Sequence, residues 1–189
     1  MNNDNTKKIA GVGVMTAIVI VLQLMGSFIR FGQFSISLVL IPIVVGAALY
    51  GPAAGAWLGL VFGVTVLLSG DASSFLVVNV FGTIATVLLK GTLAGLASGL
   101  VYKALKQKEF LAAALSALVC PVVNTGIFLI GCVLFFMPTI DQWAQAGGFG
   151  NTAAFMLIGL VGGNFLFEVL SNIILSPVIV KVIQMGKER

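Results

Sequence analysis

Long apolar runs fill almost the whole chain, and only short polar turns separate them. A helix that crosses the ~30 Å hydrocarbon core of a bilayer needs about 20 mostly apolar residues. Of the 189 residues, 59% are hydrophobic and 8% are charged, against roughly 25% charged residues in soluble domains. The chain is therefore predicted to be an all-α integral membrane protein, with no room for a soluble catalytic domain.

Glycine, proline and charged residues divide the apolar sequence into six expected spans, which form one compact bundle over residues 1–189. The Gly51-Pro52 dipeptide is a turn signal that lets one span end and the next begin at once. The span before it is short, so either it begins earlier, within Phe34–Ser37, or the protein is thin there. The first span is too long for a signal-peptide core of about 7–15 residues. The expected spans are residues 9–29, 37–50, 53–69, 80–105, 110–137 and 152–184.

The positions of the basic residues predict the orientation. An even number of spans puts both termini on one side, together with the turns near residues 51 and 107. That side collects Lys7, Lys8, Lys103, Lys106, Lys108, Lys181, Lys187 and Arg189, and the other side has Arg30. Because positively charged segments stay inside, both termini are predicted to be cytoplasmic. The net charge of +4 is thereby explained without a nucleic-acid partner.

The longest outer connection, Pro138–Asn151, is expected to be a loop. Its Asp141, Gly147 and Gly148 suit a mobile lid at the membrane surface. Trp143 is equally typical of an aromatic anchor at the membrane interface. The sequence leaves both interpretations open.

Two charged residues, Lys90 and Glu168, lie deep inside apolar runs. An ionisable side chain at the centre of a bilayer costs at least ~2.5–3.5 kcal/mol, so it usually faces the protein interior and marks a site. Counted from the cytoplasmic ends, Lys90, Asn124 and Glu168 each lie ~21–23 Å above the inner boundary. Asn164 and Asn172 share a helix face with Glu168, and Asn164 is one turn nearer the outside. Polar groups from three helices are thus predicted to meet at one depth.

Structural roles compete with a binding role for these residues. Lys90 and Glu168 could form an ion pair, and a pair that opens toward a polar ligand would serve both purposes. Asn172 could hold two helices together by a hydrogen bond. Asp71 could be a helix cap or a solvated turn residue. These alternatives stay open beside the ligand site.

Small residues recur every four positions on two of the expected spans. Such ridges let helix backbones approach closely in lipid, where packing drives association. The spacing predicts a tight contact between helices. The residues concerned are Gly55, Gly59 and Gly63 on one span and Gly91, Gly95 and Gly99 on another.

Several kinds of chemistry have no residues to support them. The chain contains no histidine, which excludes His-based acid–base chemistry and His-ligated metal sites. It has no glycine-rich nucleotide loop ending in Lys-Ser or Lys-Thr. Glu168 is alone and cannot form a carboxylate dyad. We therefore expect no enzyme, no metal and no cofactor.

Three runs resemble the substrate-binding S components of energy-coupling factor (ECF) vitamin transporters. They are Gly-Val-Met-Thr-Ala-Ile at Gly13–Ile18, Leu-Tyr-Gly-Pro-Ala-Ala-Gly at Leu49–Gly55 and Leu-Lys-Gly-Thr-Leu-Ala-Gly at Leu89–Gly95. The length, the number of spans and the basic turns are similar as well. The resemblance implies a multi-pass protein of a bacterial cell membrane that captures a vitamin from outside.

The resemblance also implies partners and site residues. Partners would be a membrane coupling subunit and two cytoplasmic ATPases. Docking would use the small residues of the first span, here Gly13 and Ala17, where the family has two alanines. Helices four to six and the outer loops would hold the vitamin. The candidate substrate-binding residues are Lys90, Asn124, Asn164, Glu168, Asp71, Phe75 and Asn79.

The polar residues favour a small anion with hydroxyl and amide groups. Lys90 would pair with the anion, and Asn124, Asn164 and Glu168 would bind hydroxyls and amides. Pantothenate fits this set best. Riboflavin is the next candidate and would need stacking on phenylalanines, and a thiamine-like cation would instead use Glu168.

Two other classes of function are kept as alternatives. A self-sufficient channel or secondary carrier would move solute alone, although the chain lacks a second inverted half. A structural membrane protein would bind no ligand at all.

Overall fold

The computed structural model describes residues 3–27, 30–31, 34–35 and 38–187. The longer helices are α1 (Asn3–Gly26), α2 (Leu40–Tyr50), α3 (Pro52–Ser69), α5 (Val80–Ala104), α6 (Glu109–Phe135) and α9 (Gly162–Lys187). Shorter elements are α4 (Ser73–Leu76), α7 (Met137–Ala146), α8 (Thr152–Ala154), the π-helix η1 (Phe155–Leu160), β1 (Arg30–Phe31) and β2 (Phe34–Ser35). The two strands pair antiparallel.

In the described part of the chain, five helices are long and apolar enough to cross a membrane: α1, α3, α5, α6 and α9. This agrees with the predicted all-α membrane fold. The remaining expected span, 37–50, corresponds to α2, which begins only at Leu40, while residue 37 lies outside the described residues. Its 11 residues reach about 16 Å, half of a bilayer core. Because α2 packs against α1, α3, α5, α6 and α9, nearly all of it is covered by protein rather than lipid.

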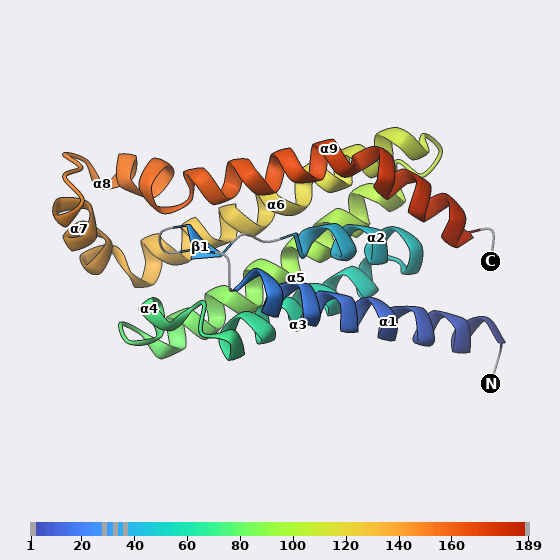
Figure 1. Ribbon diagram of the computed structural model, residues 1–189, viewed down its shortest axis with the longest axis horizontal. Coiled ribbons are helices and arrows are strands. Elements are labelled where there is room, and N and C mark those ends of the chain that lie inside the picture. The colour runs from blue at the N-terminus through green and yellow to red at the C-terminus, as the bar shows by residue number, and fades with distance from the viewer. Residues whose placement is uncertain (1–2, 28–29, 32–33, 36–37, 188–189) are drawn as a thin grey trace.

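The helix ends gather at two ends of an elongated bundle (Figure 1). The start of α1, the α2–α3 turn, the α5–α6 turn and the end of α9 lie at one end. The short helices α4, α7 and α8 lie at the other. We call the first the basic end, because Lys7, Lys8, Lys103, Lys106 and Lys108 are there.

Helices α3 and α5 approach until their backbones touch, as the glycine spacing predicts. Gly55 lies against Gly95, and Gly59 lies against Gly91. A Cβ atom built on Gly59 would overlap the carbonyl oxygen of Gly91, so only glycine fits there. This antiparallel contact brings Phe62 of α3 beside Lys90, the neighbour of Gly91.

Two expected boundaries differ from the structure at the end of the bundle opposite the basic end. The expected span 110–137 ends at Phe135, and the expected loop Pro138–Asn151 contains helix α7. Pro138 explains the difference, because proline is favoured in the first turn of a helix, where its missing N–H has no partner to lose. Ile140 and Ala144 of α7 are buried, so the segment packs on the bundle.

The expected span 152–184 is divided into three elements. It starts with the short α8, continues as the wide turn of η1 and becomes regular helix only at Gly162. The backbone N–H of Val161 donates to the carbonyl of Met156, five residues earlier, which is the π-helical pattern. Such insertions often lie beside functional sites, and this one precedes Asn164.

Candidate functional site

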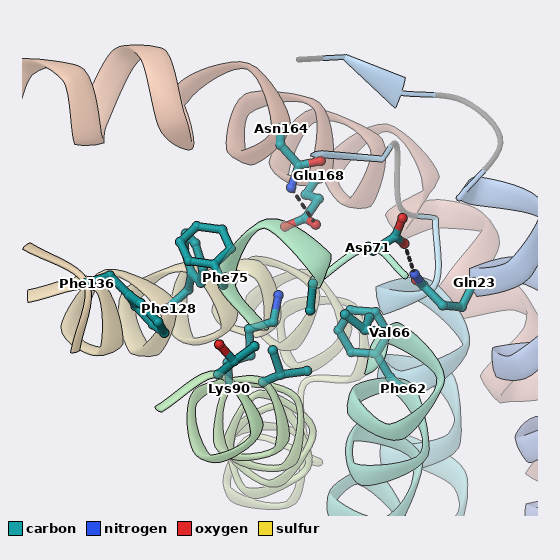
Figure 2. A pocket seen from close by; sticks show the side chains of 13 residues that line it. Gln23, Phe62, Val66, Asp71, Phe75, Lys90, Phe128, Phe136, Asn164 and Glu168 are labelled. Carbon is teal, nitrogen blue, oxygen red and sulfur yellow. Dashed lines mark hydrogen bonds between the residues drawn. The ribbon is translucent and has the colours of Figure 1, made fainter. Parts of the chain in front are cut away.

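A pocket of about 600 Å³, open solvent included, lies between α1, α3, α5, α6 and α9 (Figure 2). It is mostly apolar, with a few polar groups that point inward. Its lining residues are Gln23, Phe62, Val66, Asp71, Ala72, Phe75, Thr83, Val87, Lys90, Phe128, Phe136, Asn164 and Glu168.

Lys90 reaches into the pocket from α5 and lies between aromatic rings. Its Nζ is 5.6 Å from the centroid of Phe62 and 5.4 Å from that of Phe128, within the ~6 Å of a cation–π contact. In the described part of the chain, Lys90 and Glu168 form no ion pair at 4.0 Å or less. Lys90 and Glu168 are therefore not in direct contact, although their charges act on each other across the pocket that both line.

Glu168 enters the same pocket from α9 and is 2% exposed. Its Oε1 accepts a hydrogen bond of 3.1 Å from Nδ2 of Asn164. Its Oε2 has no hydrogen-bond partner among the described residues. Nδ2 of Asn172 donates to the backbone carbonyl of Glu168 at 2.8 Å, so Asn172 braces α9 below the pocket.

Asp71 connects the pocket to α1. Its Oδ2 accepts hydrogen bonds of 2.7 Å from Nε2 of Gln23 and 2.7 Å from Oγ of Ser27. Gln23 is 3% exposed and was missed by the sequence analysis. The signal was present, because Gln23 is the one amide side chain in the run from Ile9 to Gly26.

The outer wall of the pocket is aromatic. Phe75 packs edge-on against Phe128 (centroids 5.5 Å apart), Phe136 (5.1 Å) and Trp143 (5.4 Å). Phe75 was a candidate from the sequence, whereas Phe62, Phe128 and Phe136 were not. Phenylalanine is equally common on lipid-facing surfaces of membrane helices, so the sequence carries no signal that separates the two.

A smaller pocket of about 260 Å³ shares Lys90, Phe128 and Asn164 with the first. Asn124 lines this second pocket and also lies close to the Glu168 carboxylate. Its Oδ1 has no hydrogen-bond partner among the described residues. Lys90, Asn124, Asn164 and Glu168 thus lie in one region of the bundle.

Asn79 has a different position from the other candidates. Its side chain accepts a hydrogen bond of 2.8 Å from the backbone N–H of Gly82 and caps the start of α5. Asparagine is among the best residues for this role. Asn79 lines neither of the two pockets.

Gly13 and Ala17 lie on the exposed side of α1. A Cβ atom built on Gly13 meets nothing within 4 Å, so this face of the helix carries no packing from the rest of the bundle. Large apolar side chains, among them Val14 and Val21, are exposed on the same helix. The surface is free for lipid or for a partner helix.

Comparison with known proteins agrees with this geometry. The family described as "ECF transporter, substrate-specific component" matches residues 7–182. A relative, the pantothenic acid transporter PanT of Lactococcus lactis subsp. cremoris, is 28% identical over 197 aligned residues, which cover 95% of each protein. No solved structure matches. Because the family match spans nearly the whole chain, this multi-pass membrane protein belongs to the substrate-specific S components of the ECF transporters.

Proposed function

We propose that the vitamin bound by this S component is pantothenate. The observation that carries the proposal is the Lys90 ammonium, which faces a mostly apolar pocket and forms no ion pair within 4.0 Å in the described part of the chain. A cation in such surroundings favours an anionic ligand, because charge-assisted hydrogen bonds are strong where water is excluded. The name of the relative, a pantothenic acid transporter, points to the same ligand.

The other polar side chains suit the rest of the molecule. Pantothenate has one carboxylate, one amide and two hydroxyl groups, with two methyl groups near the hydroxyl end. Lys90 would bind the carboxylate, while Asn124, Asn164 and Glu168 would bind the amide and the hydroxyls. Phe75 and its aromatic neighbours would cover the methyl groups. Asp71 would hold the wall toward α1, and Asn79 would act indirectly, through the start of α5.

The aromatic geometry argues against riboflavin. A flat isoalloxazine ring would need an open aromatic face, but Phe75 already makes edge-on contacts at interplanar angles of 86°, 72° and 79°. Phe81 is 76% exposed and does not line the pocket, so it offers no stacking surface to a ligand there.

Six crossings with cytoplasmic termini are part of the proposal. The start of α1 and the end of α9 lie at the basic end, which five crossings alone would not allow (Figure 1). The buried helix α2 would supply the remaining crossing. The positive-inside rule then puts the basic end in the cytoplasm.

Assembly with a coupling subunit and two cytoplasmic ATPases completes the proposed import cycle. The small-residue surface of α1 around Gly13 and Ala17 would dock the coupling subunit, since small residues let membrane helices approach closely. The cytoplasmic ATPases would then act at the basic end.

Binding calorimetry on the purified full chain tests the substrate. We expect pantothenate to bind, its alcohol analogue panthenol to bind about 10–100-fold more weakly, and riboflavin and thiamine to give no signal. The absence of a pantothenate signal would overturn the proposal, and equal binding of panthenol would remove the role given to Lys90. Uptake into liposomes that contain this chain alone would instead favour a self-sufficient carrier.

A further inference from the structure

The charges that line the larger pocket do not balance. Counted at their ordinary ionisation, Lys90 brings one positive charge to the lining, and Asp71 and Glu168 bring two negative charges. Asp71 receives hydrogen bonds from Gln23 and Ser27. Glu168 keeps one carboxylate oxygen, Oε2, without a partner among the described residues. A ligand that brings one negative charge to Lys90 therefore still faces a carboxylate with spare acceptor capacity.

Glu168 is held so that this oxygen stays available. The side chain is buried, Asn164 binds the other oxygen, and Asn172 braces the backbone carbonyl one turn below. A carboxylate only accepts hydrogen bonds, and a buried acceptor without a donor is unfavourable. A hydroxyl or amide group of a ligand can donate to Oε2, beside the Asn124 side chain that lies near the same carboxylate.

Lys90 and Glu168 approach the pocket from different helices. Figure 2 shows the Lys90 nitrogen rising from α5 toward the space below Glu168, which extends from α9. A ligand that lies in this space with its anion on Lys90 can present its other groups to Glu168. Lys90 and Glu168 would then bind two different parts of one ligand.

We propose that Glu168 binds the hydroxyl end of the ligand and restricts the site to unphosphorylated hydroxy acids. The inference rests on the proposed function, in which pantothenate is the substrate. A phosphate on the terminal hydroxyl adds a charge of about −1.5 to −2 and removes the donor. It would meet Glu168 and Asp71 in a mostly apolar pocket, where like charges repel more strongly than in bulk water. The site therefore accepts the vitamin and rejects its phosphorylated form.

Competition against labelled pantothenate on the wild-type chain gives the first test. Three competitors are compared: pantothenate, phosphopantothenate and an analogue whose terminal hydroxyl is replaced by hydrogen. We expect phosphopantothenate to bind at least about 100-fold more weakly than pantothenate, and the deoxy analogue about tenfold more weakly. Equal binding of pantothenate and phosphopantothenate would overturn the inference. If pantothenate itself does not bind, the proposed function fails instead.

The variant Glu168→Gln gives the second test, with Glu109→Gln as the matched control. Glu109 lies at the basic end, outside both pockets. Glu168→Gln should lower the affinity for pantothenate by about tenfold and leave the affinity for the deoxy analogue nearly unchanged. The difference in affinity between pantothenate and phosphopantothenate should become smaller. Glu109→Gln should change none of the three. An equal loss for pantothenate and the deoxy analogue would show that Glu168 does not read the hydroxyl.

A third variant keeps the test informative if Glu168→Gln does not fold. Glu168→Asp keeps the charge but shortens the side chain, so it should still reject phosphopantothenate while binding pantothenate less well. If neither variant folds, as judged by thermal unfolding, the wild-type comparison decides alone.

Discussion

The Nζ atom of Lys90 lies 5.4 Å from the ring centroid of Phe128 and forms no ion pair within 4.0 Å in the described chain. A buried charge without an ion pair costs stability, and aromatic rings offset only part of that cost. The site therefore keeps an unfavourable charge that a ligand anion can neutralise. Binding and stability should then respond to Lys90 in opposite directions.

Lys90→Met removes this charge and keeps the length of the side chain. We expect pantothenate affinity to fall by about 1–3 kcal/mol, roughly 5–150-fold, because a charge-assisted bond is lost. The melting temperature of the free protein should stay equal or rise. Calorimetry and thermal unfolding measure the two effects, with Lys103→Met at the basic end as the control. If the affinity and the melting temperature both fall, Lys90 has a structural role.

The contact between Gly59 and Gly91 predicts a second outcome. Gly59→Ala would drive a Cβ atom into the Gly91 carbonyl oxygen, so the two helices must separate. Overpacking of this kind costs about 1–3 kcal/mol. Gly126→Ala on α6 is the control, because a Cβ atom there meets nothing within 4 Å. Equal thermal stability of the two variants would contradict the close approach.

Much of the bundle could be predicted because membrane helices follow simple rules. Length and hydropathy locate α1, α3, α5, α6 and α9, and the glycine spacing predicts the contact of α3 with α5. The short α2 could not be placed as well, since protein covers it and lipid thickness does not set its length. The start of α7 at Met137 followed a local rule, proline in a first helical turn, that a search for spans overlooks.

The site was predictable where a residue conflicts with its surroundings. Lys90 and Glu168 are charges in apolar runs, and counting along the helices brings them and Asn124 to one depth. Gln23 is an uncharged amide in a different span, and its partner Asp71 is 48 residues away, so only the fold reveals their contact. Phe62 and Phe128 carry no sequence signal at all, because apolar residues suit both lipid and pocket.

The bond between Gln23 and Asp71 predicts a coupling between α1 and the pocket wall. Gln23→Ala and Asp71→Asn should each lower stability, and the double variant should lose less than the sum. For residues in direct contact the difference is about 0.5–3 kcal/mol. The pair Thr65→Ala and Asp71→Asn serves as the control, because Thr65 donates to the carbonyl of Val61 and not to Asp71. Additive losses for Gln23 and Asp71 would argue against the coupling.

The open surface of α1 predicts a separation of binding from transport. Gly13→Leu adds bulk where nothing from the bundle lies within 4 Å, so the chain should fold and bind pantothenate normally. Docking of the coupling subunit should be lost, because close approach of two membrane helices needs small residues. Copurification of the assembled transporter measures docking, and calorimetry measures binding. Leu170→Phe on the exposed side of α9 is the control, and a docked Gly13→Leu complex would exclude this surface.

Trp143 predicts an optical signal for ligand binding. The chain has two tryptophans. The ring of Trp143 lies 5.4 Å from that of Phe75, a residue of the pocket wall. Trp57 is a half-exposed residue of α3, and its Nε1 donates to Thr16 of α1. A ligand that contacts Phe75 changes the surroundings of Trp143 and not those of Trp57. Tryptophan fluorescence should therefore respond to pantothenate in the Trp57→Phe variant and lose its response in Trp143→Phe. The reverse pattern would mean that ligand binding changes the surroundings of Trp57, at α3 and α1, and not those of Trp143 on α7.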